Sequence, residues 1–245
     1  MFGMREDKTI DEDSNLMQFT RYALADDHIT ILSESVIIAE DDSYLDVDTP
    51  LTESASSYAK DLRGITRALW NGSMDFDQTF AMFQDNVRIG LTRAWYEGAK
   101  ECGIQPSELS PEELTALRDI LYSEDTHIFG FLDYVELNSK ESGGKFAPIL
   151  SRVDLWANRY LDVVNRAKMM SCADRKMAWR LGPTEEHCVD CNRLNGKVKR
   201  ASQWARYNIR PQSPQLSCHG FNCLCYFEPT DEPMSKGPLP RLSGG

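Results

Sequence analysis

The 245-residue sequence predicts a mainly α-helical fold that ends in a small α+β module. Two observations support this prediction. Between residues 57 and 181, apolar side chains recur at steps of three and four, which is the spacing of one helix face. Five of the seven cysteines then fall between residues 188 and 225, next to an Asn-Gly turn signal. We therefore expect an elongated helical body followed by a compact cysteine-rich module.

Two flanking segments are predicted to lie outside the folded body. Residues 1–55 are expected to be an acidic flexible arm, because residues 1–60 contain 14 acidic and 4 basic residues with little periodicity. Within it, HITILSESVIIAED at residues 28–41 holds two short β-prone runs around a polar break. This stretch could form a small hairpin, or a strand that pairs with a partner. Residues 231–245 have Pro, Gly or Ser at 8 of 15 positions and are predicted to be a disordered tail.

The helical domain is predicted to span residues 56–182 and to contain four helices. The first ends at Asn71-Gly72, a good C-terminal stop, and the second ends near Gly103. The apolar stripes of these two helices consist of Leu62, Ile65, Leu69, Trp70, Phe76, Phe80, Phe83, Val87, Leu91, Ala94 and Trp95.

The third and fourth helices have equally clear boundaries in the sequence. The third begins with a capping box, in which Ser110 is the N-cap, Pro111 takes the first helical position and Glu113 closes the box. A loop with a double glycine, residues 138–145, separates it from the fourth helix. The fourth is predicted to be the longest, over residues 148–181, and to end at the Gly-Pro pair that follows.

The aromatic and methionine stripes of these helices could line a cofactor pocket, but core packing is the stronger interpretation. Every stripe is only one helix face wide, which is typical of a face buried against neighbouring helices. Cys102 and Cys172 fall inside the predicted helices, and we expect them to be small buried core residues.

The composition is that of a globular protein, with 41% hydrophobic and 27% charged residues. No apolar run is as long as a membrane span, and the N-terminus has no basic segment followed by an apolar one. We therefore expect neither a membrane segment nor a secretory signal. In a reducing compartment, clustered cysteines more often bind metal or carry out redox chemistry than form disulfides.

The cysteine-rich segment, residues 183–230, is predicted to be a zinc knuckle within the α+β module. A C-x2-C pair can face one ion, and a structural zinc site needs four soft ligands in a closed tetrahedron. Since about 48 residues bury too little apolar surface to fold alone, the metal would also replace a missing core. The predicted ligands are Cys188, Cys191, Cys218 and Cys223, with His219 and Cys225 as alternates for the fourth position.

Three other interpretations of the cysteines are a redox dithiol, a disulfide and buried free thiols. A redox C-x2-C usually sits at the N-terminus of a helix after a strand, whereas a tight turn at Asn195-Gly196 is expected to follow this motif instead. Two cysteine-rich clusters about 26 residues apart favour metal over the other interpretations. His187, directly before the motif, is expected to point away from it.

Charge is distributed unevenly along the chain. Residues 1–150 carry 29 acidic and 12 basic residues (−17), and residues 151–245 carry 9 and 15 (+6), so any nucleic acid would contact the C-terminal third. The stretch KVKRASQWARYNIR, residues 197–210, interleaves basic and aromatic side chains and has no acid, a composition that suits nucleic acid. A solvated face with the aromatics turned inward is an equally good interpretation. The candidate contacts are Lys197, Lys199, Arg200, Arg206 and Arg210.

The order of residues in WRLGPTEEHCVDCNRLNGKVKRASQW and RPQSPQLSCHGFNCLCYFEP resembles the C-terminal domain of the phage Mu F-like minor head (head morphogenesis) proteins. The likeness covers about residues 60–230. One departure is that three residues rather than two separate His219 from Cys223, and an extra Cys218 precedes the histidine, which is why Cys218 is preferred as the fourth ligand. The matching positions are Trp179, Cys188, Cys191, Gly196, Val198, Pro211, Pro214, His219, Cys223 and Cys225.

The resemblance implies a low-copy structural virion component bound near the portal inside the head, and in the host cytoplasm during assembly. It would act in head assembly or in genome packaging or delivery. Portal or capsid protein is the expected partner, with viral DNA as a further candidate, and no small-molecule substrate is expected. The alternatives are a zinc-supported nuclease, with His219 or His187 as base, and a host-directed toxin module. The sequence contains no G-x-S-x-G, H-E-x-x-H or Walker motif, so no enzymatic activity is expected.

Overall fold

The computed structural model describes residues 16–25, 28–37, 51–221 and 223–243, and it divides the chain into two units, 1–46 and 47–245. The first unit contains an antiparallel hairpin of β1 (Leu16–Ala25) and β2 (His28–Ile37). The polar residues expected to break the stretch 28–41 do not interrupt β2, which is continuous from His28 to Ile37. The strand that pairs with β2 is β1, which precedes it in the sequence. Ladder hydrogen bonds come from the backbone, so polar side chains do not interrupt them. Of the rest of the predicted arm, residues 1–15, 26–27 and 38–50 lie outside the described ranges. Residues 51–55 belong to the first helix of the second unit, so the predicted boundary at 55/56 lies a few residues too late.

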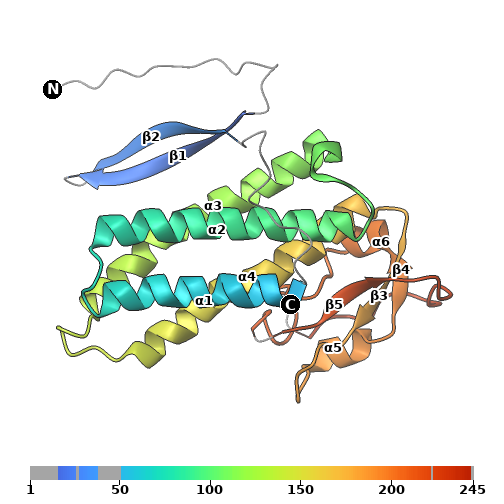
Figure 1. Cartoon of the computed structure of the whole chain (residues 1–245). Coiled ribbons are helices and arrows are strands. Elements are labelled where there is room, and N and C mark those ends of the chain that lie inside the picture. Colours follow the sequence, from blue (N-terminus) through green and yellow to red (C-terminus); the bar gives the residue numbers. More distant parts are fainter. Residues whose placement is uncertain (1–15, 26–27, 38–50, 222, 244–245) are drawn as a thin grey trace. The chain divides into compact units, whose positions relative to one another are not determined.

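The second unit is mainly helical, as predicted, and its body consists of four long helices (Figure 1). Helix α2 packs against each of the other three, and α1 also packs against α4. No helix in the described ranges is long and apolar enough to cross a membrane. The helices are α1 (Leu51–Trp70), α2 (Phe76–Lys100), α3 (Pro111–Leu137) and α4 (Phe146–Ser171), with a short 3-10 turn, η2 (Pro106–Glu108), before α3.

The local stop and start signals act as expected. Gly72 follows α1 with a φ of 75°, a left-handed conformation that favours glycine and ends the helix. At the start of α3, Ser110 Oγ accepts a hydrogen bond from Glu113 N at 3.3 Å, and Glu113 Oε2 accepts one from Ser110 N at 2.9 Å. The predicted stripes form the core of the body, with fully buried Leu62, Phe83, Val87, Leu91, Trp95, Leu117, Ile128, Val153 and Tyr160.

The fourth helix is shorter than predicted, because it ends at Ser171 rather than near residue 181. Residues 176–180 instead form β3 (Lys176–Arg180), which pairs with a strand on each side and buries Met177, Ala178 and Trp179. Residues 176–180 therefore form the central strand of a sheet. The spacing of apolar residues in so short a segment does not distinguish a buried strand from the end of a helix. The predicted domain boundary at 182/183 would cut this sheet.

The C-terminal module is a three-stranded antiparallel sheet of order β4-β3-β5 with two short helices. Its core contains three aromatic rings, those of Trp179, Trp204 and Phe227, whose centroids lie 5.2–5.9 Å apart. The module therefore has an apolar core of its own. The remaining elements are α5 (Val189–Leu194), β4 (Val198–Arg200), α6 (Ala201–Arg206) and β5 (Tyr226–Pro229).

Helix α4 joins the body to the module through buried polar side chains. Asn165 Oδ1 accepts a hydrogen bond from Phe227 N at 2.9 Å, and its Nδ2 donates to Gln212 Oε1 at 2.7 Å. Lys168, only 2% exposed, donates from Nζ to Phe227 O at 3.0 Å and pairs with Glu101 Oε2 at 2.7 Å. The body and the module consequently form one compact unit.

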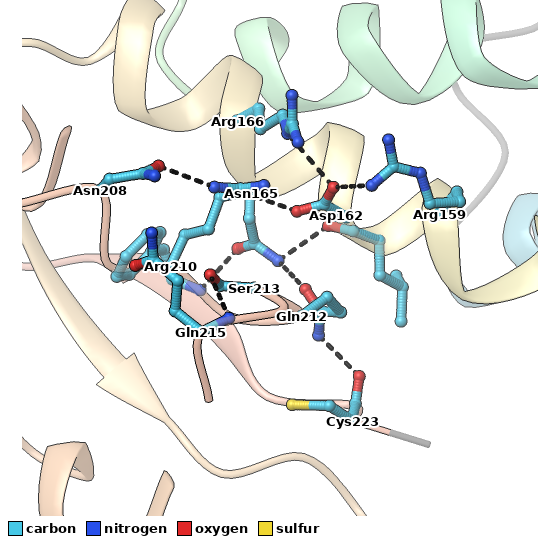
Figure 2. Close-up of polar contacts among 12 residues, drawn as sticks. Arg159, Asp162, Asn165, Arg166, Asn208, Arg210, Gln212, Ser213, Gln215 and Cys223 are labelled. Carbon is cyan, nitrogen blue, oxygen red and sulfur yellow. Dashed lines mark hydrogen bonds and ion pairs between the residues drawn. The ribbon is translucent and has the colours of Figure 1, made fainter. Parts of the chain in front are cut away.

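A buried ion network strengthens the same junction. Asp162 on α4 is 1% exposed and pairs with Arg159 at 2.7 Å, Arg166 at 3.2 Å and Arg210 at 2.6 Å (Figure 2). Arg159 also pairs with Glu124 of α3 at 2.6 Å. Since a buried carboxylate is costly unless it is paired, Asp162 holds the loop that carries Arg210 against α4.

The predicted disordered tail is ordered over residues 231–243 and packs on the module. Ser235 N donates to Val198 O at 2.9 Å, and Ser243 N donates to Asp190 Oδ1 at 2.9 Å. Leu239 and Leu242 pack against the apolar core of the module. The Pro- and Ser-rich composition was misleading because the module, rather than the tail itself, supplies the partners.

Cys102 and Cys172 form a disulfide instead of being separate core thiols. They lie at the ends of α2 and α4, with their Cα atoms 5.2 Å apart. Helix packing brings them together across 70 residues of sequence, which no local pattern could indicate. The bond fixes the end of α2 to the end of α4, just before the turn that leads into β3.

Replacing both Cys102 and Cys172 with serine should lower the free energy of unfolding by about 2–4 kcal/mol, because the cross-link restricts the unfolded chain. Guanidinium titrations followed by circular dichroism would measure the loss. A reductant should destabilise the wild type and leave the double variant unchanged. Equal midpoints for the wild type with and without reductant would contradict the prediction.

Candidate metal centre

The first two cysteines are positioned by a short helix. Helix α5 begins after Cys188, whose Sγ caps it by accepting a hydrogen bond from Cys191 N at 3.4 Å. The predicted tight turn at Asn195-Gly196 does follow the motif, with Gly196 at a φ of 73° and Lys197 N donating to Leu194 O at 2.9 Å. The expectation that this turn would take the place of a helix was wrong, because α5 lies between Cys188 and the turn. The setting still differs from that of a redox dithiol in a βαβ unit, because the strands of this module are antiparallel.

The other three cysteines lie on the loop between α6 and β5, which glycines allow to pack closely. Gly220 has a φ of 77°, and a β-carbon there would overlap the carbonyl oxygen of Gln212. A β-carbon on Gly182 would likewise overlap the carbonyl oxygen of Leu224. Both positions therefore require glycine, and the second brings the segment before Cys188 against the loop that contains Cys225.

The five cysteines gather into two overlapping groups of three. The sulfurs of Cys188, Cys191 and Cys218 all lie within 4.8 Å of one another, as do those of Cys191, Cys223 and Cys225. Cys191 belongs to both groups, and its Sγ is 3.7 Å from that of Cys223. Cys191, Cys223 and Cys225 are buried, whereas the other two are half-buried. The cluster is thus positioned to hold a metal ion, with one more thiol than a tetrahedral site needs.

The sulfurs share protons in a way that favours thiolates at one side of the cluster. Hydrogen bonds with Cys191 and then Cys223 lower the pKa of Cys225 to about 4. Hydrogen bonds with Cys191 and Cys218 also lower the pKa of Cys223. Hydrogen bonds with Cys218, Cys223 and Cys225 raise the pKa of Cys191, which therefore acts as the donor. A cation could take the place of these protons, because the thiolate is the form that binds metal.

The two nearby histidines differ from each other in position. His219 lies outside both sulfur groups, is exposed, and has its Nδ1 2.9 Å from Pro214 O. His187 was expected to point away from the cluster, but its Nδ1 is 4.0 Å from Cys225 Sγ and 3.1 Å from Thr184 Oγ1. The fold of residues 182–188 against the loop before β5 turns this histidine toward the edge of the cluster.

Asp190, inside the C-x2-C motif, organises the loop around the cluster. Its buried carboxylate accepts hydrogen bonds from Ser217 N at 2.8 Å and from Ser243 N at 2.9 Å. Burial opposes ionisation, but these backbone hydrogen bonds lower its pKa. Because Ser217 directly precedes Cys218, Asp190 sets the position of that cysteine. In the sequence, the only indication that Asp190 positions this loop is that an acidic residue lies between the two cysteines of the C-x2-C motif.

Gln212 fixes the other side of the cluster. Its Nε2 donates to the carbonyl oxygen of Cys223 at 2.7 Å, and its Oε1 accepts from Asn165 (Figure 2). The same Nε2 also donates to the carbonyl oxygen of Cys225 at 2.6 Å. The buried amide thereby connects α4 to both cysteines. Sequence reasoning missed Gln212, since nothing local distinguishes it from an exposed glutamine.

The basic stretch 197–210 is not a single exposed face. Arg210 is only 4% exposed and is paired with Asp162, so its predicted role as an external contact was wrong. Trp204 is buried in the core, whereas Tyr207 is 56% exposed. Lys199 Nζ donates to the carbonyls of residues 235 and 237 and so holds the tail. Of the candidate contacts, Arg200 and Arg206 are exposed and Lys197 and Lys199 are half-buried.

Comparison with known proteins does not assign the chain to a family. No family model, curated protein or solved structure shows a significant match to it. Function is therefore inferred from the geometry of the site and from the order of the sequence motifs.

Asp190→Asn should lower the free energy of unfolding by about 1–3 kcal/mol, because a charged acceptor of buried N–H groups is lost. It should also accelerate release of bound metal to a chelator, since Cys218 is less firmly held. Asp174→Asn, at an exposed position in the turn after α4, is the matched control and should change neither quantity. If both variants behave alike, Asp190 does not organise the cluster.

Proposed function

We propose that this chain is a phage minor head protein, a structural virion component that acts with portal or capsid protein in head assembly or in genome packaging or delivery. The observation that supports it is the five-cysteine cluster, which is built into the end of a helical body in the motif order Trp, C-x2-C, Gly-Lys-Val, His, Cys-x-Cys. Most of its sulfurs are buried, which suits a centre that stabilises a fold rather than one that binds substrate.

The metal in this proposal is a structural zinc ion held by Cys188, Cys191, Cys218 and Cys223. Soft thiolate ligands select zinc, copper(I) or iron–sulfur clusters, and four thiolates around one ion suit zinc. Cys191 and Cys223, 3.7 Å apart, would link the two halves of the segment. Cys225 would be the fifth thiol, close to the ion but outside the ligand set.

The partner surface in this proposal is the exposed part of the basic stretch. Arg206 is exposed on α6, and Lys197 is half-buried in the turn before β4. Both are available to an acidic surface of the portal or to DNA phosphates, whereas Arg210 and Lys199 are engaged within the module.

Serine substitution at each of the five cysteines tests the zinc site. Cys188→Ser, Cys191→Ser, Cys218→Ser and Cys223→Ser should each reduce bound zinc well below one ion per chain, because a tetrahedral site loses a thiolate. Cys225→Ser and His219→Ala should retain one ion.

Elemental analysis of the purified variants, with competition by a chelator, would measure this. A wild type with well under one zinc and freely reactive thiols would refute a zinc centre. Loss of zinc in Cys225→Ser, with retention in Cys218→Ser or Cys223→Ser, would instead assign the site to a different set of four.

Co-purification with the portal protein of the same phage genome tests the partner. We expect Lys197→Glu/Arg206→Glu to weaken this association, because two positive charges are reversed on the proposed surface. Arg118→Glu/Lys140→Glu, at exposed positions on the helical body and the loop after α3, makes the same change in net charge and should have little effect.

A gel-shift titration at two salt concentrations would separate the DNA alternative. If DNA is the contact, the first double variant should lower the salt slope by about two, at roughly 0.9 per lost phosphate contact. Wild-type behaviour of that variant in both assays would contradict the proposed surface, and metal-dependent cleavage of DNA would favour the nuclease alternative.

A further inference from the structure

A cleft of about 500 Å³ lies where α2, α3 and α4 of the body meet α6 and the loop that follows it. Its walls are mostly apolar and include Trp95 of α2, Ile120 of α3, Met169 of α4 and Pro214 of the loop. No cysteine is among its lining residues, so it is distinct from the metal centre. Its volume lies within the range of small-molecule sites, about 300–1,000 Å³.

One part of the cleft is positively charged. Arg166 and Arg210 both line it, and both pair with Asp162. With Arg159 and Glu124, the network contains three guanidinium groups and two carboxylates, a net charge of +1. Within the described chain Arg166 pairs only through Nε, at 3.2 Å from Asp162, which leaves its two terminal nitrogens available as donors.

We propose that the cleft binds a small organic anion that has an apolar body and a single carboxylate-like group. The apolar body fits the walls formed by the four helices and Pro214, and the negative charge offsets the +1 of the arginine network. Its oxygen atoms would accept hydrogen bonds from the two terminal nitrogens of Arg166. This inference is independent of the proposed role in head assembly and of the metal.

The test uses the full chain with 1-naphthoate as the probe and neutral 1-naphthamide as its isostere, followed by ligand-observed NMR and calorimetry. We expect naphthoate to bind with a Kd below about 1 mM and naphthamide at least about tenfold more weakly, because only the former supplies a charge. Arg166→Gln should remove this difference, because it takes away the charged donor of the cleft. Arg118→Gln, an exposed arginine of α3 outside the cleft, is the matched control and should not change it.

Ala116→Trp provides a test that leaves the arginine network intact. Ala116 is a half-buried residue of α3 that lines the cleft, so a large side chain there should fill the cleft and abolish binding of both probes. The proposal is overturned if naphthoate does not bind the wild type, or if naphthamide binds equally well. It is also overturned if a folded Arg166→Gln or Ala116→Trp variant binds naphthoate as the wild type does.

Discussion

The position of the cysteine cluster depends on one buried charge, the carboxylate of Asp162 on α4. A carboxylate that is 1% exposed requires cationic partners, and Arg210 is the partner that comes from the C-terminal module. This pair holds the loop after α6 against the helix and so places Gln212 opposite Asn165. Gln212 in turn holds the carbonyls of Cys223 and Cys225, so two of the five cysteines are positioned through an ion pair between the body and the module.

The buried cysteines are part of the apolar core of the module, because Cys191, Cys223 and Cys225 lie in the same buried cluster as its aromatic rings. Trp179, Trp204 and Phe227 pack together between the sheet and α6, and Lys168 and Asn165 attach β5 to α4. Within this core, the cysteines join α5 to the loop before β5. The sequence-based expectation that metal replaces a missing core is therefore incomplete, because the module borrows α4 and has a core of its own.

Prediction from sequence succeeded where the signal was local. The capping box at Ser110, the stop at Gly72 and the helical stripes all depend on residues within a few positions of one another. It failed at the end of α4, at the tail and at the Cys102–Cys172 disulfide. In each case the deciding partner is distant in sequence: β4 and β5 for residues 176–180, Asp190 and Val198 for the tail, and α2 for Cys172.

For the candidate site, residue types and spacing were enough to show that five thiols and an enclosed acid lie in one short segment, and therefore which residues could hold a metal. The folded chain was needed to show that Cys225 belongs to the cluster, that His187 lies at its edge and that His219 turns toward Pro214. It also decided that Arg210 is an internal anchor and that Trp95 and Arg166 line one cleft. The reason is physical: residue type and spacing define chemical capacity, whereas burial and the choice of partner depend on elements that meet only when the chain has folded.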